Sequence, residues 1–270
     1  MKSVDFLKNK GVDVDKSLEL FGDMNIYNET MQDFLDGINE KKNNLATYKS
    51  RNDWANYAIF AHSIKSDARY LGFTNVAEVA LQHEMAGKES NQHFIEKDYN
   101  HLLQVTDEMT NVIKEYLSGS DNEITREDVN NGEYPKKTLE VNNNGPVEAI
   151  LVADDSKLVS NFATKMLQDK YTVVTAKDGE EVFNVITSGN YKILCLLLDL
   201  NMPNIGGFEV LDYFKENNLF NQIPVSIITG ENSRDAIKKA FTYDICDMLV
   251  KPFSKDDIKR VVEKTIGYKK

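Results

Sequence analysis

The sequence predicts a multidomain chain, with an all-α four-helix bundle followed by a doubly wound α/β domain of five parallel strands. Residues 1–117 show helical periodicity with few glycines and no proline. After Pro146, short apolar runs alternate with amphipathic stretches, as in β/α units. Between these parts, the chain is rich in turn-forming residues and lacks periodicity, which predicts a linker. We therefore expect the bundle at 1–117, the linker at 118–146 and the α/β domain at 147–270.

Composition limits the location and the partners of the protein. The formal net charge is −11, and because nucleic-acid surfaces depend on Lys and Arg contacts to phosphate, we expect no nucleic-acid partner. Apolar runs fall short of the length that spans a bilayer, and no secretory start is present, so we expect a cytoplasmic protein without membrane insertion. Cys195 and Cys246 lack a CxxC spacing, and we expect them to be reduced, apolar thiols.

The first part of the chain reads as helices that each bury one side. Tyr27, Met31 and Phe34, for example, recur at spacings of three and four and form one apolar stripe. Gly72 and Gly87 are stop signals after two of the helices. The pattern predicts helices at 16–21, 26–45, 52–71, 74–86 and 91–117. Since short connections join the four longer helices, we expect an antiparallel bundle.

The second part alternates strand and helix. The pattern predicts strands at 149–153, 171–176, 193–200, 225–229 and 248–251, and helices at 157–168, 180–187, 208–216, 234–242 and 255–266. Five β/α units of this size fit a flavodoxin-like parallel sheet. The run that begins at Ile193 is apolar on both faces, as in a central strand, so ligands are expected at its carboxyl end. Beyond the last helix we expect no DNA-binding or enzymatic output domain.

Polar residues of complementary chemistry follow four of the predicted strands. Asp154 and Asp155 follow the first, Asp199 ends the third, Thr229 closes the fourth and Lys251 closes the fifth. Hard cations such as Mg²⁺ prefer carboxylate oxygens and water. A metal ion, a hydroxyl and an ammonium group can neutralise phosphoryl oxygens while one carboxylate attacks phosphorus. These residues predict a site for a divalent cation and a phosphoryl group.

In the order DD, D, T and KPF, these residues resemble the receiver domain of bacterial two-component response regulators, over residues 147–270. The resemblance implies that Asp199 is the phosphoacceptor. It also implies that Thr229 binds a phosphoryl oxygen and that Lys251 pairs with the acyl phosphate. The implied metal ligands for Mg²⁺ are Asp154, Asp155, Asp199 and the backbone carbonyl of Asn201.

A second resemblance surrounds His62. The string AHSIKSDARYLG resembles the HxLKGxxxxLG pattern of histidine-containing phosphotransfer (HPt) domains, and the fit extends over about 12–117. It implies that His62 is a phosphoacceptor on an exposed helix face, where a neutral imidazole is nucleophilic near pH 7. Lys65, three residues later on the same face, would offer a cation to the arriving phosphate. Ser66 stands where the family has a small Gly. The other histidines lack such a setting and are expected to be surface or packing residues: His83, His93 and His101.

Together the resemblances imply a two-component protein that relays phosphoryl groups through His62 and Asp199, with Mg²⁺ as cofactor. It would be a phosphotransfer intermediate whose receiver catalyses its own phosphorylation, rather than a metabolic enzyme. The implied partners are a sensor histidine kinase and other receiver or HPt proteins.

Two alternatives remain. In one, the receiver is a phosphorylation-switched interaction module and the helical domain does not relay. In the other, the site is that of an aspartate-nucleophile phosphatase of the haloacid dehalogenase type. The second is disfavoured because Asn201 stands where such enzymes have a second Asp, and because the DD pair precedes the nucleophile.

The predicted linker bears on whether the two phosphoacceptors meet. A flexible segment of the length of 118–146 has a typical end-to-end distance of about 30 Å. Tethering of this kind gives effective concentrations of about millimolar. We therefore expect exchange between His62 and Asp199 within one chain, with external partners also served. The sequence is compatible with a short helix at 124–129.

Overall fold

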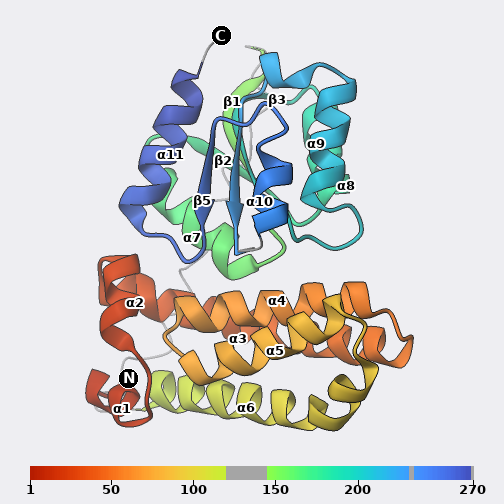
Figure 1. Ribbon diagram of the computed structural model, residues 1–270. Helices are drawn as coiled ribbons and strands as arrows, with labels where there is room; N and C mark the ends of the chain where they lie inside the picture. The colour runs from red at the N-terminus through yellow and green to blue at the C-terminus, as the bar shows by residue number, and fades with distance from the viewer. Residues whose placement is uncertain (120–144, 231–233, 269–270) are drawn as a thin grey trace.

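The computed structural model describes residues 1–119, 145–230 and 234–268 (Figure 1). In the first of these ranges the chain is all-helical, with two short helices followed by four long ones. The helices are α1 (Val4–Asn9), α2 (Val14–Phe21), α3 (Met24–Ser50), α4 (Trp54–Tyr70), α5 (Thr74–Lys88) and α6 (Gln92–Ser118). The predicted four-helix bundle is confirmed, with α3, α4, α5 and α6 as its long helices.

Side-chain caps explain where most of these helices begin. The carboxylates of Asp13, Asp23 and Asp53 accept backbone N–H groups in the first turns of α2, α3 and α4, and the amide oxygen of Asn91 does the same for α6. Such caps satisfy amide groups that the helix itself leaves without a partner. The end of α2 falls at Gly22, which has a φ of 85° that glycine adopts without strain.

Helix α1 was not predicted from the sequence. It has 6 residues, too few to be stable by itself. Its single buried residue, Leu7, joins the bundle core, and the N–H of Lys2 donates to the carbonyl of Tyr116 on α6 at 2.9 Å. Tertiary contacts therefore hold this helix, and a local sequence pattern does not reveal them.

The second part of the chain is an α/β domain with one parallel sheet in the order β2-β1-β3-β4-β5. Its strands are β1 (Val147–Ala153), β2 (Thr172–Ala176), β3 (Tyr191–Leu198), β4 (Val225–Thr229) and β5 (Asp247–Val250). Its helices are α7 (Lys157–Leu167), α8 (Gly179–Thr187), α9 (Gly207–Glu216), α10 (Arg234–Ala240) and α11 (Lys255–Gly267), with a 3-10 turn, η1, at Leu219–Asn221. The predicted doubly wound sheet is confirmed.

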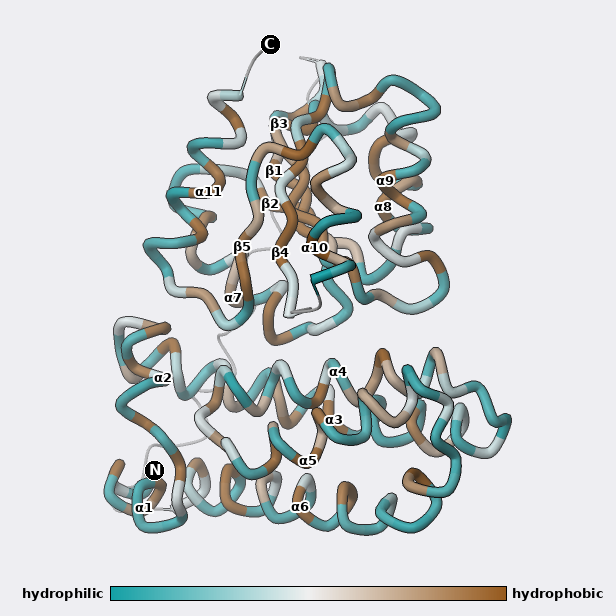
Figure 2. The backbone as a smooth tube through the Cα atoms, in the orientation of Figure 1, coloured by the Kyte–Doolittle hydropathy of each residue, from teal (hydrophilic) through white to brown (hydrophobic). Residues whose placement is uncertain are grey.

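Alternating side chains of the strands supply two separate cores. On β1, Leu151 faces the core covered by α8, α9 and α10, whereas Ile150 and Val152 face the side covered by α7 and α11. Strands buried on both faces are hydrophobic throughout. Figure 2 shows this concentration of hydrophobic residues along the central strands, with hydrophilic residues on the outer helices.

The bundle packs against the α/β domain. In Figure 1 helix α4 runs beneath the edge of the sheet where the strands end. Here Phe21 and Tyr70 of the bundle meet Phe162 and Phe253 of the α/β domain, with ring centroids 5.1 Å apart for Phe21 and Phe162 and 5.7 Å for Tyr70 and Phe253. These rings join the bundle core and the α7–α11 side of the sheet into one apolar cluster.

Three further expectations can be compared with the structure. Cys195 is buried, Cys246 is half-buried, and both are free thiols, as predicted. No helix among the described residues is long and apolar enough to cross a membrane. Most of the predicted linker, including the short helix considered at 124–129, lies outside the described residues.

Candidate functional site

The register of the sheet brings the predicted acidic residues together. Ala153 at the end of β1 pairs with Leu198 at the end of β3, so Asp154 and Asp199 follow in neighbouring positions. The N–H of Asp199 donates to the carbonyl of Ala153 at 2.8 Å. Because both strands stop together, their first loop residues lie at one edge of the sheet, and ligand atoms of Asp154, Asp155 and Asp199 all lie within 4.8 Å of one another.

Lys251 reaches this acidic cluster from β5. Thr229, at the end of β4, is fully buried, and its carbonyl accepts the N–H of Lys251 at 2.8 Å. The ammonium of Lys251 lies 2.5 Å from Oδ2 of Asp199 and 2.6 Å from Oδ2 of Asp154. The strand ends thus bring Asp154, Asp155, Asp199 and Lys251 together, and β4 ends next to Lys251 at Thr229.

Backbone groups fix the orientation of two of the carboxylates. Oδ1 of Asp154 accepts the N–H of Ser156 at 3.0 Å, and Oδ1 of Asp199 accepts the N–H of Asn201 at 3.3 Å. Behind Asp199 the chain comes back very close, since a Cβ at Gly207 would lie 2.2 Å from the carbonyl oxygen of Asp199. Only glycine fits there, so the start of α9 closes the loop that carries Asp199.

Burial and charge set the protonation behaviour of the cluster. Burial raises the pKa of Asp154 to about 8; the ammonium of Lys251 opposes this rise, and the charge of Asp199 adds to it by a smaller amount. Burial likewise raises the pKa of Asp155. For Lys251, burial works against the charged form, but the surrounding carboxylates dominate and raise its pKa. The ammonium of Lys251 therefore does not offset the effect of burial on the two neighbouring carboxyl groups.

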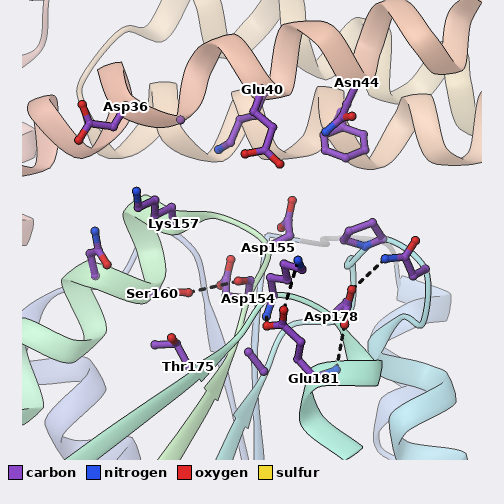
Figure 3. A pocket seen from close by; sticks show the side chains of 18 of the residues that line it. Asp36, Glu40, Asn44, Asp154, Asp155, Lys157, Ser160, Thr175, Asp178 and Glu181 are labelled. Carbon is purple, nitrogen blue, oxygen red and sulfur yellow. Dashed lines mark hydrogen bonds and ion pairs between the residues drawn. The ribbon is translucent and has the colours of Figure 1, made fainter. Parts of the chain in front are cut away.

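This donor set fits a magnesium ion. Mg²⁺ binds carboxylate oxygens and retains several waters, and an added cation would favour the ionised form of Asp154, which burial disfavours. Asp154 and Asp155 line a cavity of about 500 Å³, which gives room for water ligands. Figure 3 shows Asp155 at this cavity, opposite Glu40 and Asn44 on α3 of the bundle.

The structure corrects the expected exposure of His62. Its side chain was expected on an exposed helix face, yet the residue is 1% exposed. Residues around the whole circumference of this part of α4 are buried, including His62, Ser63, Ile64, Lys65 and Ser66. A helix buried on every side is covered by more than its own bundle. The prediction failed because one side of α4 packs on the bundle core and the other faces the α/β domain (Figure 1).

Glu84 of α5 fixes the orientation of the His62 ring. Its Oε1 lies 2.9 Å from Nδ1 of His62, and its Oε2 lies 2.5 Å from the ammonium of Lys65. Burial raises the pKa of Glu84, but the hydrogen bond and charge of His62 and the ion pair with Lys65 hold it well below the usual range. An ionised carboxylate only accepts hydrogen bonds, so in the neutral form of the ring the bond to Glu84 favours the proton on Nδ1 and the lone pair on Nε2.

Lys65 lies on the Nδ1 side of the ring. Its ammonium is 3.1 Å from Nδ1 of His62 and is buried with Glu84. Burial lowers its pKa, against the upward effect of Glu84. The structure shows Lys65 holding the carboxylate that orients His62, and its role toward an arriving phosphate stays a prediction.

The Nε2 atom of His62 points at the α/β domain. A Cβ atom at Gly230, which directly follows Thr229, would lie 2.9 Å from Nε2. Nε2 has no hydrogen-bond partner among the described residues, and the same holds for Nδ2 of Asn201. Both residues line one cavity of about 320 Å³. Nε2 of His62 and the loop after Asp199 therefore lie at the same cavity.

Sequence reasoning missed Glu84, although a signal was present. On α5, Val76, Ala80 and Glu84 are spaced by four and lie on one buried face. A carboxylate on an apolar stripe needs a partner, since an unpaired buried charge is strongly unfavourable. The partner, His62, lies on another helix, and the sequence of one helix does not show which helix packs against it.

The histidines outside the site behave as expected, with His83 packed in the bundle against the hydroxyl of Tyr57 and His101 exposed.

Comparison with protein families gives two matches that divide the chain as the fold does. Residues 29–115 match the Hpt domain, and residues 150–263 match the response regulator receiver domain. The first match contains His62 and Glu84, and the second contains the acidic cluster, Thr229 and Lys251.

Individual relatives are similar to less than half of the chain. The chemotaxis protein CheY of Pseudomonas aeruginosa is 30% identical over 117 residues, which cover 43% of this chain and 93% of CheY. The two-component response regulator ORR3 of Oryza sativa is 29% identical over 122 residues, which cover 45% of this chain and 92% of ORR3.

A third relative is much longer than this chain. The CAI-1 autoinducer sensor kinase/phosphatase CqsS of Vibrio cholerae is 34% identical over 109 residues, which cover 40% of this chain and 16% of CqsS. The fold, the acidic cluster and these matches agree, and the chain belongs to the two-component signalling proteins, with an Hpt domain followed by a response regulator receiver domain.

Proposed function

We propose that this protein is a phosphorelay intermediate in which Nε2 of His62 and the carboxylate of Asp199 exchange a phosphoryl group within one chain. The observation that carries the proposal is the placement of Nε2, which carries the lone pair, against Gly230 at the strand ends that hold Asp199. Holding the two reacting groups in one structure replaces a bimolecular encounter by a unimolecular step.

The transfer balances without a change of protonation. A carboxylate oxygen of Asp199 attacks phosphorus, the P–O bond forms and the P–N bond to Nε2 breaks. The electron pair of the broken bond stays on Nε2, which leaves a neutral imidazole with its proton on Nδ1, hydrogen-bonded to Glu84. Glu84 stabilises the positive charge that the ring carries while it is phosphorylated. The reverse reaction follows the same path.

The remaining site residues have supporting roles in this proposal. Lys251 contacts the attacking carboxylate and would neutralise charge on the phosphoryl oxygens, and the hydroxyl of Thr229 would bind one of them. Asp154, Asp155, Asp199 and the Asn201 carbonyl would hold Mg²⁺, which supplies further charge neutralisation when bound. Lys65 is a positioning residue, since it acts on His62 through Glu84.

The partners follow from this chemistry. Phosphoryl groups would arrive from a sensor histidine kinase or another phosphorylated protein of the same system, and would leave to other receiver or HPt proteins in the cytoplasm. The acidic net charge supports an output through protein contacts rather than through DNA.

Phosphate labelling tests the proposal. Incubation with acetyl phosphate and Mg²⁺ is expected to load Asp199, and mass spectrometry is then expected to find phosphate on His62 as well. Asp199→Asn is expected to abolish both signals, and His62→Gln only the second. Because His62 is buried, His62→Gln can lower the stability of the fold, and a thermal unfolding scan of this variant is needed to separate that effect from the loss of the phosphoacceptor. Labelling confined to Asp199 in the wild-type protein would instead support a switched interaction module with a non-relaying bundle.

Dilution separates exchange within a chain from exchange between chains. The rate at which label appears on His62 is expected to stay constant over a wide range of protein concentration. A mixture of the His62→Gln and Asp199→Asn chains provides the bimolecular reference, in which the rate must fall on dilution. Equal concentration dependence in both samples would contradict transfer within the chain.

A further inference from the structure

The face of the bundle that covers the receiver is complementary to it in charge. Asp33 on α3 accepts a hydrogen bond from Nδ2 of Asn161 at 2.9 Å and pairs with the ammonium of Lys165 at 3.3 Å. Glu29, one turn earlier on α3, lies 3.0 Å from the same ammonium. Asn161 and Lys165 are four residues apart on α7, so both face α3. Two acids of the bundle thus meet one cation and one amide of the receiver.

The pair of Asp33 and Lys165 is shielded from solvent, whereas Glu29 is largely exposed. The side chains of Lys165 and Asp33 are 8% and 13% exposed. Removing one partner of such a pair leaves the other charge in a poorly hydrated place, and this has a larger effect than breaking a surface pair. The pairing is therefore suited to distinguish one receiver surface from another.

A second polar contact and the aromatic rings complete the surface. The hydroxyl of Ser156, which caps α7, donates to Oδ1 of Asp67 at 2.8 Å, and Asp67 is itself paired with Lys41 of the bundle. The hydroxyl of Tyr70 accepts the N–H of Phe253, directly after Pro252, at 3.2 Å. The surface between bundle and receiver thus combines an apolar cluster with polar contacts, as specific protein interfaces do.

This packing encloses the nucleophile of the bundle. His62 is 1% exposed, and its Nε2 lies against Gly230 of the receiver. A second protein that is to reach Nε2 must take the place of the chain's own receiver on the same face. The surface that places His62 against the receiver of the same chain therefore also blocks the access of other proteins to His62.

We infer that this face of the bundle is a docking surface whose resident occupant is the receiver of the same chain. Its specificity rests on the pairing of Asp33 with Asn161 and Lys165. His62 becomes accessible to other proteins only when the receiver of the same chain leaves this surface. An external receiver competes well for the surface only if the helix that corresponds to α7 carries an amide and a cation one turn apart. The statement on external receivers rests on the proposed relay, whereas the docking and its specificity do not.

Charge exchange at one pair tests the inference on the full chain. The single variants are Asp33→Lys and Lys165→Asp, and the third variant combines them. Lys192→Asp is the matched control, because Lys192 pairs with Glu148 and both side chains are exposed. The readout is the rate at which diethyl pyrocarbonate modifies each histidine, measured by mass spectrometry, and it needs no phosphotransfer.

The sequence contains internal references for this experiment, since it has 4 histidines. His93 and His101 are exposed and report the activity of the reagent, and His83 is buried in the bundle and reports its unfolding. Each single variant is expected to raise modification of His62 roughly tenfold or more while His83 stays protected. The combined variant is expected to return to within about threefold of the wild-type rate, since the pair is restored in reverse.

Every outcome decides the inference. If the single variants leave His62 as protected as in the wild-type protein, the described docking is not what shields it. If they expose His62 but the combined variant does not restore protection, specificity does not reside in this pair. The two proposals can also fail separately. If the combined variant restores the protection of His62 but the wild-type protein never carries phosphate on His62, the docking is supported and only the relay is refuted.

Discussion

The ring of His62 and the backbone of Gly230 are in direct contact across the two domains, so closely that a Cβ at Gly230 would lie 2.9 Å from Nε2 and 3.0 Å from Cε1. The ring cannot turn aside easily, because its Nδ1 is held by Glu84. A glycine at this position therefore sets how closely the bundle approaches the receiver.

Gly230→Ala is expected to push the bundle and the receiver apart at this contact. The added methyl group overpacks the interface, which typically costs about 1–3 kcal/mol. The docked form should lose stability and His62 should react faster with diethyl pyrocarbonate. Gly267→Ala is the control, because nothing lies within 4 Å of a Cβ at that position. Unchanged protection of His62 in Gly230→Ala would show that the contact does not limit the docking.

Tyr70→Phe is expected to weaken the docking without disturbing the bundle. The change keeps the ring that packs on Phe253 but leaves the buried N–H of that residue without its acceptor, at about 1–3 kcal/mol. Tyr27→Phe removes a comparable hydrogen bond, to the carbonyl of Leu71, inside the bundle. The rate of His62 modification by diethyl pyrocarbonate should rise in Tyr70→Phe and not in Tyr27→Phe. Equal rises in both variants would indicate a general loss of bundle stability rather than weaker docking.

Glu84→Gln is expected to slow phosphoryl transfer to and from His62 by roughly tenfold or more. A neutral amide can also donate to Nδ1, so the ring proton is no longer confined to that atom, and the charge opposite the phosphorylated ring is lost. Labelling of Asp199 by acetyl phosphate should be unchanged, and this separates the effect from damage to the receiver. Lys88→Gln is the control, since Lys88 is a half-exposed partner of the same carboxylate. A normal rate in Glu84→Gln would remove this residue from the mechanism.

Acid is expected to destabilise the protein partly through Glu84. Burial raises the pKa of this carboxyl, but His62 and Lys65 hold it well below the value of an unfolded chain. A group whose pKa is depressed by folding stabilises the fold above its unfolded pKa, and this contribution is lost as the pH falls. The free energy of unfolding should therefore decrease below about pH 5, and more steeply than in Glu84→Gln. Denaturant titrations at several pH values measure both slopes, and parallel slopes would contradict the shifted pKa.

Magnesium is expected to stabilise the chain through the acidic cluster. A ligand at about one hundred times its dissociation constant adds about 2.7 kcal/mol to the free energy of unfolding. Asp155→Asn should remove most of the rise in melting temperature that Mg²⁺ produces. Asp36→Asn serves as the comparison, since Asp36 lines the same cavity from α3 but is not part of the cluster. Equal loss in both variants would mean that Mg²⁺ acts elsewhere.

The local pattern of the sequence determined the helices and strands of this protein other than the short α1 and η1. The alternation of apolar and turn-forming residues was sufficient for the order of strands and helices, because each reports a local period and a local stop signal. It also placed Asp154, Asp155, Asp199, Thr229 and Lys251 together, since parallel strands that end in register bring their next residues to one edge.

Only the tertiary structure decided how the two domains meet. The burial of His62, the role of Lys65 and the partnership with Glu84 depend on contacts between elements far apart in the chain. The pairing of Asp33 with Lys165 joins residues of two domains, and each by itself reads as an ordinary charge on a helix surface. A periodic pattern shows which side of a helix is buried, but it does not show what buries it, because that is set by the shape and charge of a surface elsewhere in the sequence.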